Sequence, residues 1–256
     1  MTIEPKVDVI IPNYNETDLL MRAVDSVLKQ GEVINKIIII DDGSNEKTIH
    51  YLNFHISVMD KVQIIFSERL VNPGAMRQIG LNHATSVWVA FLDADDFWEQ
   101  DKIERQINFA LKNNFQVFCS NANLYKNFVK TKPIYQFNLE PKISTKNLLK
   151  ENIIINSTIL VKRECFQKIG GYPKEHHLRG VEDYSAWLRV SVYFRIGFMN
   201  ETLVNYQDSE NSFGKQQNRI LRDIAVYDFV FWSKCKASVF VRWYAKYYLC
   251  RVLGRA

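Results

Sequence analysis

Three carboxylates crowd the end of an apolar segment. Asp93, Asp95 and Asp96 lie within four residues and directly follow VWVAFL at positions 87–92. Crowded like charges repel one another, and each is costly to remove from water, so the cluster indicates a positive partner. Carboxylate oxygens are hard ligands that suit Mg²⁺ or Mn²⁺, and such an ion commonly shares its coordination sphere with a phosphate. The structural alternative is a solvated turn whose aspartates cap a helix.

Two further acidic sites occur elsewhere in the chain. DDGS at positions 41–44 follows four consecutive isoleucines, and its small residues let a ligand approach the backbone. Glu182 and Asp183 follow Gly180 and begin a segment with helical spacing. Acids at such a position commonly cap free amides and favour the helix dipole. Whether the three sites act together depends on the elements that position them.

Those elements alternate between strand-like and helix-like patterns over roughly the first 120 residues. Apolar runs predict buried strands at 7–12, 36–44, 62–66, 87–93 and 116–125. Apolar residues at helical spacing predict helices at 16–31, 46–58, 73–84 and 103–114. This alternation predicts a parallel sheet with helices on both faces, whose ligands bind at the carboxyl ends of the strands. Asn13 and the first two acidic sites lie at those ends, so we expect them to line one crevice.

The second half of the chain is less regular. We expect a long surface excursion at 128–152, then a strand at 153–161 and a short helix. Residues 170–194 are interpreted as a loop that leads into a helix containing Asp183.

Composition excludes several classes of protein. An apolar content of 47% in 256 residues is enough for a substantial core, so global disorder is not expected. The four cysteines follow no metal-ligand spacing and are interpreted as free thiols in a reducing compartment. The N-terminus lacks a signal-peptide pattern, and no apolar run approaches the ~20 residues that span a bilayer. These features predict a cytoplasmic chain.

Five motifs in order resemble those of family 2 glycosyltransferases: PNYN at 12–15, IIIIDDGS at 37–44, N-x-G-x-x-R at 72–77, FLDADD at 91–96 and GVEDYSAWLR at 180–189. The resemblance covers roughly the first 210 residues and implies an inverting enzyme. It implies an α/β GT-A fold, which is a Rossmann-like, mostly parallel sheet flanked by helices. We expect this domain at 1–212, with a nucleotide-binding half at about 1–120 and an acceptor half at about 121–212. A C-terminal helical extension at 213–256 would follow.

The resemblance also implies roles for residues on the donor side. Asp42 would hydrogen-bond the base, Asp93 would face the ribose or sugar, and Asp95 would hold Mn²⁺ or Mg²⁺ against the two phosphates, with Asp96 in support. Such an ion makes the departing nucleoside diphosphate a better leaving group. The full set implied to bind the nucleotide sugar is Pro12, Asn13, Tyr14, Asn15, Glu16, Asp41, Asp42, Asn72, Gly74, Arg77, Asp93, Ala94 and Asp95.

Inversion also needs a base that removes the proton of the acceptor hydroxyl. By resemblance to the family's acidic pair this base is Asp183, with Glu182 as the reserve candidate, while helix capping remains the structural alternative. The residues expected to bind the acceptor are Asn156, Ser157, His177 and Trp187. For Trp187, packing in the hydrophobic core is as plausible as contact with the acceptor. His176 and His177 are adjacent and point in different directions in most backbones, so joint metal ligation is not expected.

One segment departs from the family pattern. Many relatives carry an arginine and then a histidine after a tyrosine near this point, and that histidine can contact metal or phosphate. Here Gln207 and Ser209 take those places. Asp208 or Glu210 would have to substitute, or the metal would rely on Asp95 and the phosphates. The third protein ligand is therefore left open.

The last ~40 residues interleave basic and aromatic side chains, with no acid after Asp228. A helix of this kind suits an anionic membrane surface, whereas the alternative is a helix packed on the domain. Aromatic interleaving also occurs in nucleic-acid binders, but nothing else in the chain indicates a nucleic-acid partner. We expect peripheral contact with the inner face of the cytoplasmic membrane.

The leading hypothesis is thus a metal-dependent inverting glycosyltransferase that uses a UDP-hexose or UDP-N-acetylhexosamine. Its expected acceptor is a saccharide on a polyprenyl diphosphate lipid, in O-antigen or capsule assembly. The alternative is a non-catalytic protein that binds nucleotide sugars. A phosphatase with an aspartyl nucleophile is disfavoured because Phe97 stands where such enzymes carry threonine or valine. A Rossmann dehydrogenase is disfavoured because the first strand leads into PNYN and not into a glycine-rich turn.

Overall fold

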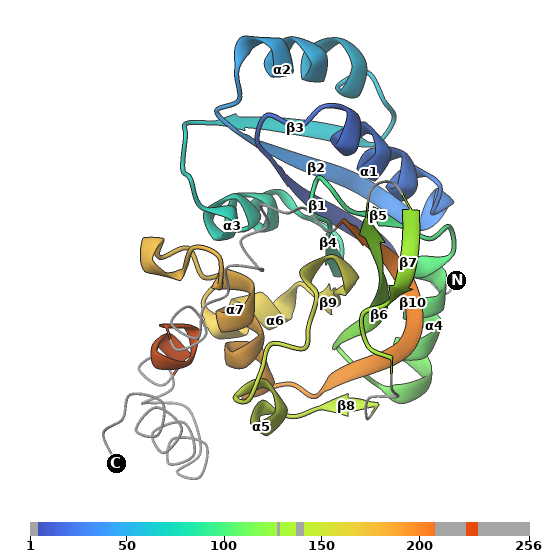
Figure 1. The fold of residues 1–256 in the computed structure, drawn as a ribbon, viewed down its shortest axis with the longest axis vertical. Helices are drawn as coiled ribbons and strands as arrows, with labels where there is room; N and C mark the ends of the chain where they lie inside the picture. The colour runs from blue at the N-terminus through green and yellow to red at the C-terminus, as the bar shows by residue number, and fades with distance from the viewer. Residues whose placement is uncertain (1–4, 127–128, 137–140, 208–223, 230–256) are drawn as a thin grey trace.

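The computed structural model describes residues 5–126, 129–136, 141–207 and 224–229 (Figure 1). Their strands form one mixed sheet in the order β3-β2-β1-β4-β9-β6-β10-β5, with β7 paired to β6 and β8 paired to β10. The strands are β1 (Val7–Asn13), β2 (Ile34–Asp42), β3 (Val62–Ser67), β4 (Trp88–Phe91), β5 (Phe97–Trp98), β6 (Val117–Lys126), β7 (Val129–Pro133), β8 (Lys142–Ile143), β9 (Leu160–Lys162) and β10 (Ile196–Gln207).

Helices cover both faces of this sheet (Figure 1). The α-helices are α1 (Asp18–Leu28), α2 (Glu46–Tyr51), α3 (Pro73–His83), α4 (Lys102–Asn113), α5 (Thr145–Leu148), α6 (Glu164–Ile169) and α7 (Glu182–Ser191). Shorter helical turns are η1 (Gly31–Val33), η2 (Leu52–Ile56), η3 (Asn156–Thr158) and η4 (His176–Leu178). A further helical segment lies at 224–229.

The central strands are buried on both faces because nearly every residue in them is apolar. In β1, Ile10 belongs to the core on the side of α3 and α7, whereas Val9 and Ile11 belong to the core on the side of α1 and α4. Ile38 and Ile39 of β2 divide in the same way, one to each core. This alternation follows from the two-residue period of a strand.

The predicted α/β fold with a mostly parallel sheet is confirmed. β1 pairs in parallel with β2 and β4, and β2 pairs in parallel with β3. The carboxyl ends of these strands therefore share one edge. The strongest sequence patterns, including the helices at 73–84 and 103–114, correspond to α3 and α4.

The prediction of a strand over 153–161 was wrong. Only the short β9 is a strand, and it runs antiparallel to both β4 and β6. Before it, Asn156, Ser157 and Thr158 form the turn η3. The long strand β10, parallel to β6, was not predicted from the sequence.

The described part of the C-terminal region packs on the domain. Ala225, Val226 and Phe229 are buried in the core on the side of α7. Asp228 forms an ion pair with Arg189 of α7, with 2.8 Å between the closest oxygen and nitrogen. The rest of the predicted extension, at 213–223 and 230–256, lies outside the described residues. Within the described residues, no helix combines the length and the hydrophobicity that a bilayer span needs.

Candidate functional site

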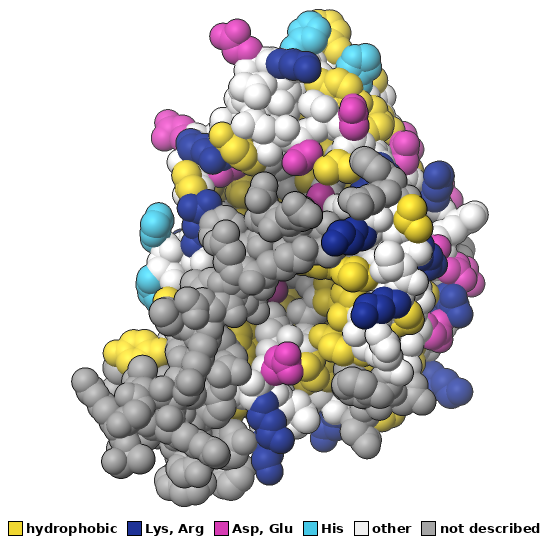
Figure 2. Space-filling view, viewed as in Figure 1, with side chains coloured by type: hydrophobic (Ala, Val, Ile, Leu, Met, Phe, Trp, Pro, Cys, Tyr) yellow, Lys and Arg dark blue, Asp and Glu magenta, His cyan; other side chains and the backbone are white. Residues whose placement is uncertain are grey.

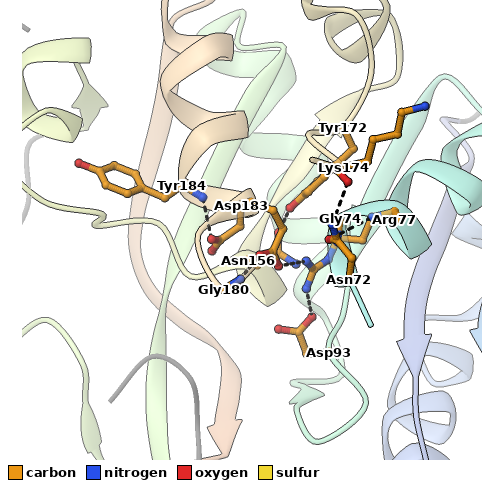
Figure 3. Close-up of polar contacts among 12 residues, drawn as sticks. Asn72, Gly74, Arg77, Asp93, Asn156, Tyr172, Lys174, Gly180, Asp183 and Tyr184 are labelled. Atoms are coloured by element: carbon orange, nitrogen blue, oxygen red, sulfur yellow. Dashed lines mark hydrogen bonds and ion pairs between the residues drawn. The ribbon is translucent and has the colours of Figure 1, made fainter. Parts of the chain in front are cut away.

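One buried arginine joins two of the acidic sites. Arg77, on α3, donates from one terminal nitrogen to Asp93 Oδ1 at 2.6 Å and from the other to Glu182 Oε1 at 2.8 Å. Figure 3 shows Arg77 between Asp93 and the segment that begins α7. The side chains of Arg77 and Glu182 are about 5% exposed, so solvent does little to weaken the second pair. For Asp93, the positive partner expected from the sequence is therefore Arg77, a residue of the chain itself.

The two acids at the start of α7 have different surroundings. Glu182 Oε1 accepts from Arg77, and Oε2 accepts from the backbone N–H of Gly180 at 2.6 Å. Asp183 Oδ1 accepts from the N–H of Tyr184 at 2.6 Å, while its Oδ2 has only a 3.5 Å contact with Asn152. Glu182 is thus a fully engaged ionic partner, whereas Asp183 keeps an oxygen available to a substrate.

The protonation of Asp183 suits proton transfer. Burial and the neighbouring charge of Glu182 raise the pKa of the Asp183 carboxyl to about 7, although Arg77 acts in the opposite direction. A general base works best when its pKa lies close to the working pH. Geometry and electrostatics therefore both favour Asp183 over Glu182 as the group that accepts a proton.

Asp95, in the turn after β4, has more negative than positive charge around it. Its side chain is partly exposed, and its carboxylate is hydrogen-bonded by the backbone N–H of Asp95 itself. Burial and the charge of Asp93 raise its pKa to about 7, Glu16 adds to the rise, and Arg22 opposes it. A bound cation would relieve this repulsion, so the donor set fits a hard divalent ion. Burial also raises the pKa of Glu16 itself.

The chain supplies only part of a metal coordination sphere. In the described part of the chain, no group of three or more His, Cys, Asp and Glu side chains is arranged to hold an ion. Asp96, predicted to support the metal, is fully buried. Its two oxygens contact Ser157 Oγ at 2.5 Å and the N–H of Gln207 at 2.8 Å. A metal held at Asp95 would therefore complete its sphere with water and phosphate oxygens.

The acids after β2 fix two loops. Asp41 accepts from Asn13 Nδ2 at 2.9 Å and from the Ser44 hydroxyl at 2.6 Å. Asp42 accepts from the backbone N–H groups of Leu70 and Val71, at 2.6 and 2.9 Å. Both acids are about 1% exposed. The predicted contact between Asp42 and the base stays a prediction, and in this structure both Asp42 oxygens are engaged by the backbone.

Tyr14 and Arg69 form an exposed platform beside these loops. The guanidinium of Arg69 lies 3.2 Å from the ring centroid of Tyr14, whose side chain is 42% exposed. Asn15 accepts from the N–H of Asn45 at 2.9 Å and so ties the end of β1 to the start of α2. Pro12, two residues before Tyr14, is buried, and so is Ala94 between Asp93 and Asp95. A flat cation stacked on an aromatic ring presents a surface on which a base can stack.

The residues expected to bind the acceptor separate into buried and exposed sets. Trp187 is fully buried against Phe91, Phe166 and Tyr172, which is the core position left open by the sequence. Ser157 is fully buried as well, whereas His177 is exposed on η4.

Asn156 lies between the core and the acidic sites. It is 5% exposed, and its Oδ1 accepts from the Tyr172 hydroxyl at 3.1 Å. Its Nδ2 has no hydrogen-bond partner among the described residues. An unpaired buried donor is costly, so Asn156 fits a contact with a substrate oxygen or water.

The start of α3 holds the loop that precedes α7. Asn72 caps α3 by accepting from the N–H of Gly74 at 2.9 Å, and its Nδ2 donates to the carbonyl of Lys174 at 2.8 Å (Figure 3). A Cβ at Gly74 would lie 2.0 Å from the carbonyl oxygen of Pro173. The spacing N-x-G-x-x-R thus gives a cap, a close backbone approach and the bridging arginine Arg77 from one helix.

We expect Gly74→Ala to displace that loop. Alanine normally stabilises a helix relative to glycine, but here the added methyl meets backbone and should destabilise the protein by about 1–3 kcal/mol. Urea unfolding measures this, and Asn82→Ala on the exposed side of α3 is the matched control, with no loss expected. An unchanged midpoint for Gly74→Ala would show that the loop moves without cost.

Sequence reasoning missed three residues of the site. Arg22 donates to the carbonyl of Asp95 at 2.8 Å, Arg69 stacks on Tyr14, and Tyr172 lies beneath Arg77 with 5.6 Å from ring centroid to guanidinium carbon. Their signals were weak, because two single arginines and a tyrosine within the segment 170–173 show no spacing that distinguishes them from other residues.

Most of the chain is similar to known glycosyltransferases. The family model "Glycosyl transferase family 2" matches residues 8–170. An uncharacterized glycosyltransferase of Haemophilus influenzae is 34% identical over 72% of this chain and 71% of its own length. UDP-Glc:alpha-D-GlcNAc-diphosphoundecaprenol beta-1,3-glucosyltransferase WfgD of Escherichia coli is 29% identical over 72% of this chain and 69% of its own length.

Solved structures show the same fold at low identity. The crystal structure of S. aureus TarS 1–349 in complex with UDP-GlcNAc has a TM-score of 0.73 and is 15% identical. The match covers 98% of this chain and 72% of that one. The expected GT-A fold is thereby confirmed.

Proposed function

Because the chain belongs to glycosyl transferase family 2 and is a glycosyltransferase, we propose that it moves a sugar from a UDP-sugar to a saccharide carried on a polyprenyl diphosphate lipid. WfgD, which is similar over 72% of this chain, is named for a UDP-linked glucose donor and a diphosphoundecaprenol acceptor. The TarS structure contains UDP-GlcNAc. These similarities support a UDP-sugar donor and a lipid-linked saccharide acceptor for this chain. They also support a role in the assembly of a surface polysaccharide.

The observation that carries the proposed mechanism is the Arg77 bridge. One terminal nitrogen of the Arg77 guanidinium donates to Asp93, which lies in the same motif as Asp95. The other donates to Glu182, the neighbour of Asp183. The metal-binding and proton-accepting acids are therefore parts of one cluster, as a single sugar shared between them requires.

In the proposed reaction, Asp183 Oδ2 accepts the proton of the acceptor hydroxyl while the hydroxyl oxygen attacks the anomeric carbon. The bond from that carbon to the diphosphate oxygen breaks in the same step. Direct displacement inverts the carbon, so an α-linked donor gives a β-linkage. Asp95 would hold a divalent cation, with Asp93 beside it. Such an ion, when bound, neutralises charge on the departing nucleoside diphosphate. Arg77 pairs with both Asp93 and Glu182 and so keeps the two acidic segments together.

The acceptor side is proposed from the shape of the surface. Figure 2 shows a hollow on the face that is turned toward the viewer. Hydrophobic side chains line it, and Lys and Arg side chains lie to its right. A saccharide stacks on apolar surface, and basic side chains suit a diphosphate. The basic residues of the tail at 213–256 would add attraction to an anionic membrane and would hold the enzyme peripherally at the cytoplasmic face.

A thermal-shift panel tests the donor and the metal together. We expect UDP and UDP-sugars at about 100 times their Kd to stabilise the protein by about 2.7 kcal/mol, with a larger shift when Mn²⁺ is present, whereas GDP should give little. Release of UDP in the presence of acceptor then separates an enzyme from a non-catalytic binding protein. Equal shifts for UDP and GDP would contradict the proposed donor class.

A further inference from the structure

The acidic turn after β4 exposes two carboxylates and hides a third. The N–H of Asp96 donates to the carbonyl of Asp93 at 3.0 Å, which closes the turn. Asp93 and Asp95 are partly exposed, whereas Asp96 is fully buried. Neighbouring aspartates of one motif thus have different environments. We therefore expect Asp96 to have a different role from Asp93 and Asp95.

A single buried hydroxyl grips this turn at two points. Ser157 Oγ donates to Asp96 Oδ2 at 2.5 Å and accepts from the N–H of Asp93 at 3.1 Å. Ser157 is itself held, because its carbonyl accepts from the indole of Trp98 at 3.0 Å. Gln106 of α4 donates to the next carbonyl, that of Thr158, at 2.8 Å. The hydroxyl is therefore anchored by β5 and α4.

The other side of the turn is held by the end of β10 and by α1. Asp96 Oδ1 accepts from the N–H of Gln207 at 2.8 Å. Arg22 donates to the carbonyl of Asp95 at 2.8 Å and packs its guanidinium against the ring of Phe97 at 4.4 Å. The turn that carries Asp95 is thus held by contacts from α1, β10 and η3, while the Asp95 carboxylate stays available to a ligand.

We propose that Asp96 and Ser157 are positioning residues which orient Asp93 and Asp95, and that Asp96 is not a metal ligand. This inference rests on the proposed function, in which Asp95 seats a cation against the nucleotide diphosphate. Both oxygens of Asp96 already have partners inside the protein. Turning the Asp96 side chain toward a cation at Asp95 would break two buried hydrogen bonds.

The chemistry of the two contacts gives a sharp contrast between variants. In Asp96→Asn, the amide oxygen still accepts from Gln207 and the amide nitrogen donates to the Ser157 oxygen, so both contacts persist. In Ser157→Ala, the anchor is lost while Asp95 is untouched. In Asp95→Asn, the charge that holds the cation is lost. Thr158→Val is the matched control, because that hydroxyl donates only to the carbonyl of Ile155 in its own turn.

The experiment is titration calorimetry of UDP into each full-length variant, with and without Mn²⁺, together with the melting temperature. We expect wild type, Asp96→Asn and Thr158→Val to gain affinity from Mn²⁺ to within about threefold of one another. Ser157→Ala should lose about 10–100-fold of the Mn²⁺-dependent affinity, the range typical for residues that support a metal ligand. Its affinity without Mn²⁺ should stay unchanged, which a general loss of structure would not permit.

Each contrary result has a distinct meaning. If Asp96→Asn loses the Mn²⁺ response as completely as Asp95→Asn, Asp96 is a ligand and the inference is overturned. If Ser157→Ala responds like Thr158→Val, the hydroxyl does not position the turn. If Ser157→Ala fails to fold, the comparison of the two aspartate variants still decides. Wild-type UDP affinity that ignores Mn²⁺ would instead overturn the proposed metal role, and this assignment with it.

Discussion

Replacing Asp183 by asparagine should lower kcat by about 10²–10⁴-fold, the usual contribution of a general base, while UDP-sugar affinity changes little. The amide cannot accept the hydroxyl proton, yet it can keep the contact with the N–H of Tyr184. Steady-state kinetics with donor and acceptor varied separately measure this, and calorimetry with UDP supplies the binding control. Normal transfer by Asp183→Asn would remove the base assignment.

The pH dependence of kcat distinguishes the two acids of the pair. Asp183 must be deprotonated to act, and its pKa is raised to about 7, so kcat should fall as the pH drops through that value. Glu182→Gln removes a neighbouring negative charge, so the Asp183 pKa and the midpoint of the profile should move to lower pH. The measurement uses saturating Mn²⁺ and donor, because a bound cation would stabilise ionised Asp95 and leave Asp183 as the titrating group. A profile that is flat between pH 5 and 8 would argue against Asp183.

The sequence predicts the donor half of the fold well because its strands are buried on both faces. Four isoleucines in a row before Asp41 can only satisfy a two-sided core, and β2 is formed there. The strand β10 was missed because polar residues such as Asn200, Glu201 and Asn205 interrupt its apolar pattern. Its pairing with β6 comes from sheet context that a local pattern does not contain.

The sequence motifs indicate which residue types gather at the candidate site, but not which of them contact one another. The motifs single out Arg77 and Glu182, but these residues are separated by 105 positions and nothing in their spacing predicts a direct contact. Likewise, the DADD motif does not indicate which aspartate points inward. That depends on Ser157, which the interrupted apolar segment at 153–161 suggested only as a contact for the acceptor.

Replacing Arg77 by methionine should destabilise the protein by about 3–5 kcal/mol, because it leaves Glu182 buried without its cation. The two ion pairs measure 2.6 and 2.8 Å, and the Arg77 side chain is 5% exposed. Arg77→Lys should recover only part of this, since one ammonium does not reproduce two nitrogens held in a fixed plane. Urea unfolding at pH 7 gives the free energies.

The control is an arginine with the same number of partners at the surface. Arg105 lies 3.4 Å from Asp101 and 2.6 Å from Glu201, but all three side chains are roughly half exposed, so Arg105→Met should cost only about 0–1 kcal/mol. Adding Glu182→Gln to Arg77→Met removes the stranded charge and should restore part of the stability. If the double variant is no more stable than Arg77→Met, the loss reflects packing around Tyr172 and not the buried charge. Recovery of stability without recovery of transfer would instead show that the bridge also aligns the two acidic sites for the reaction.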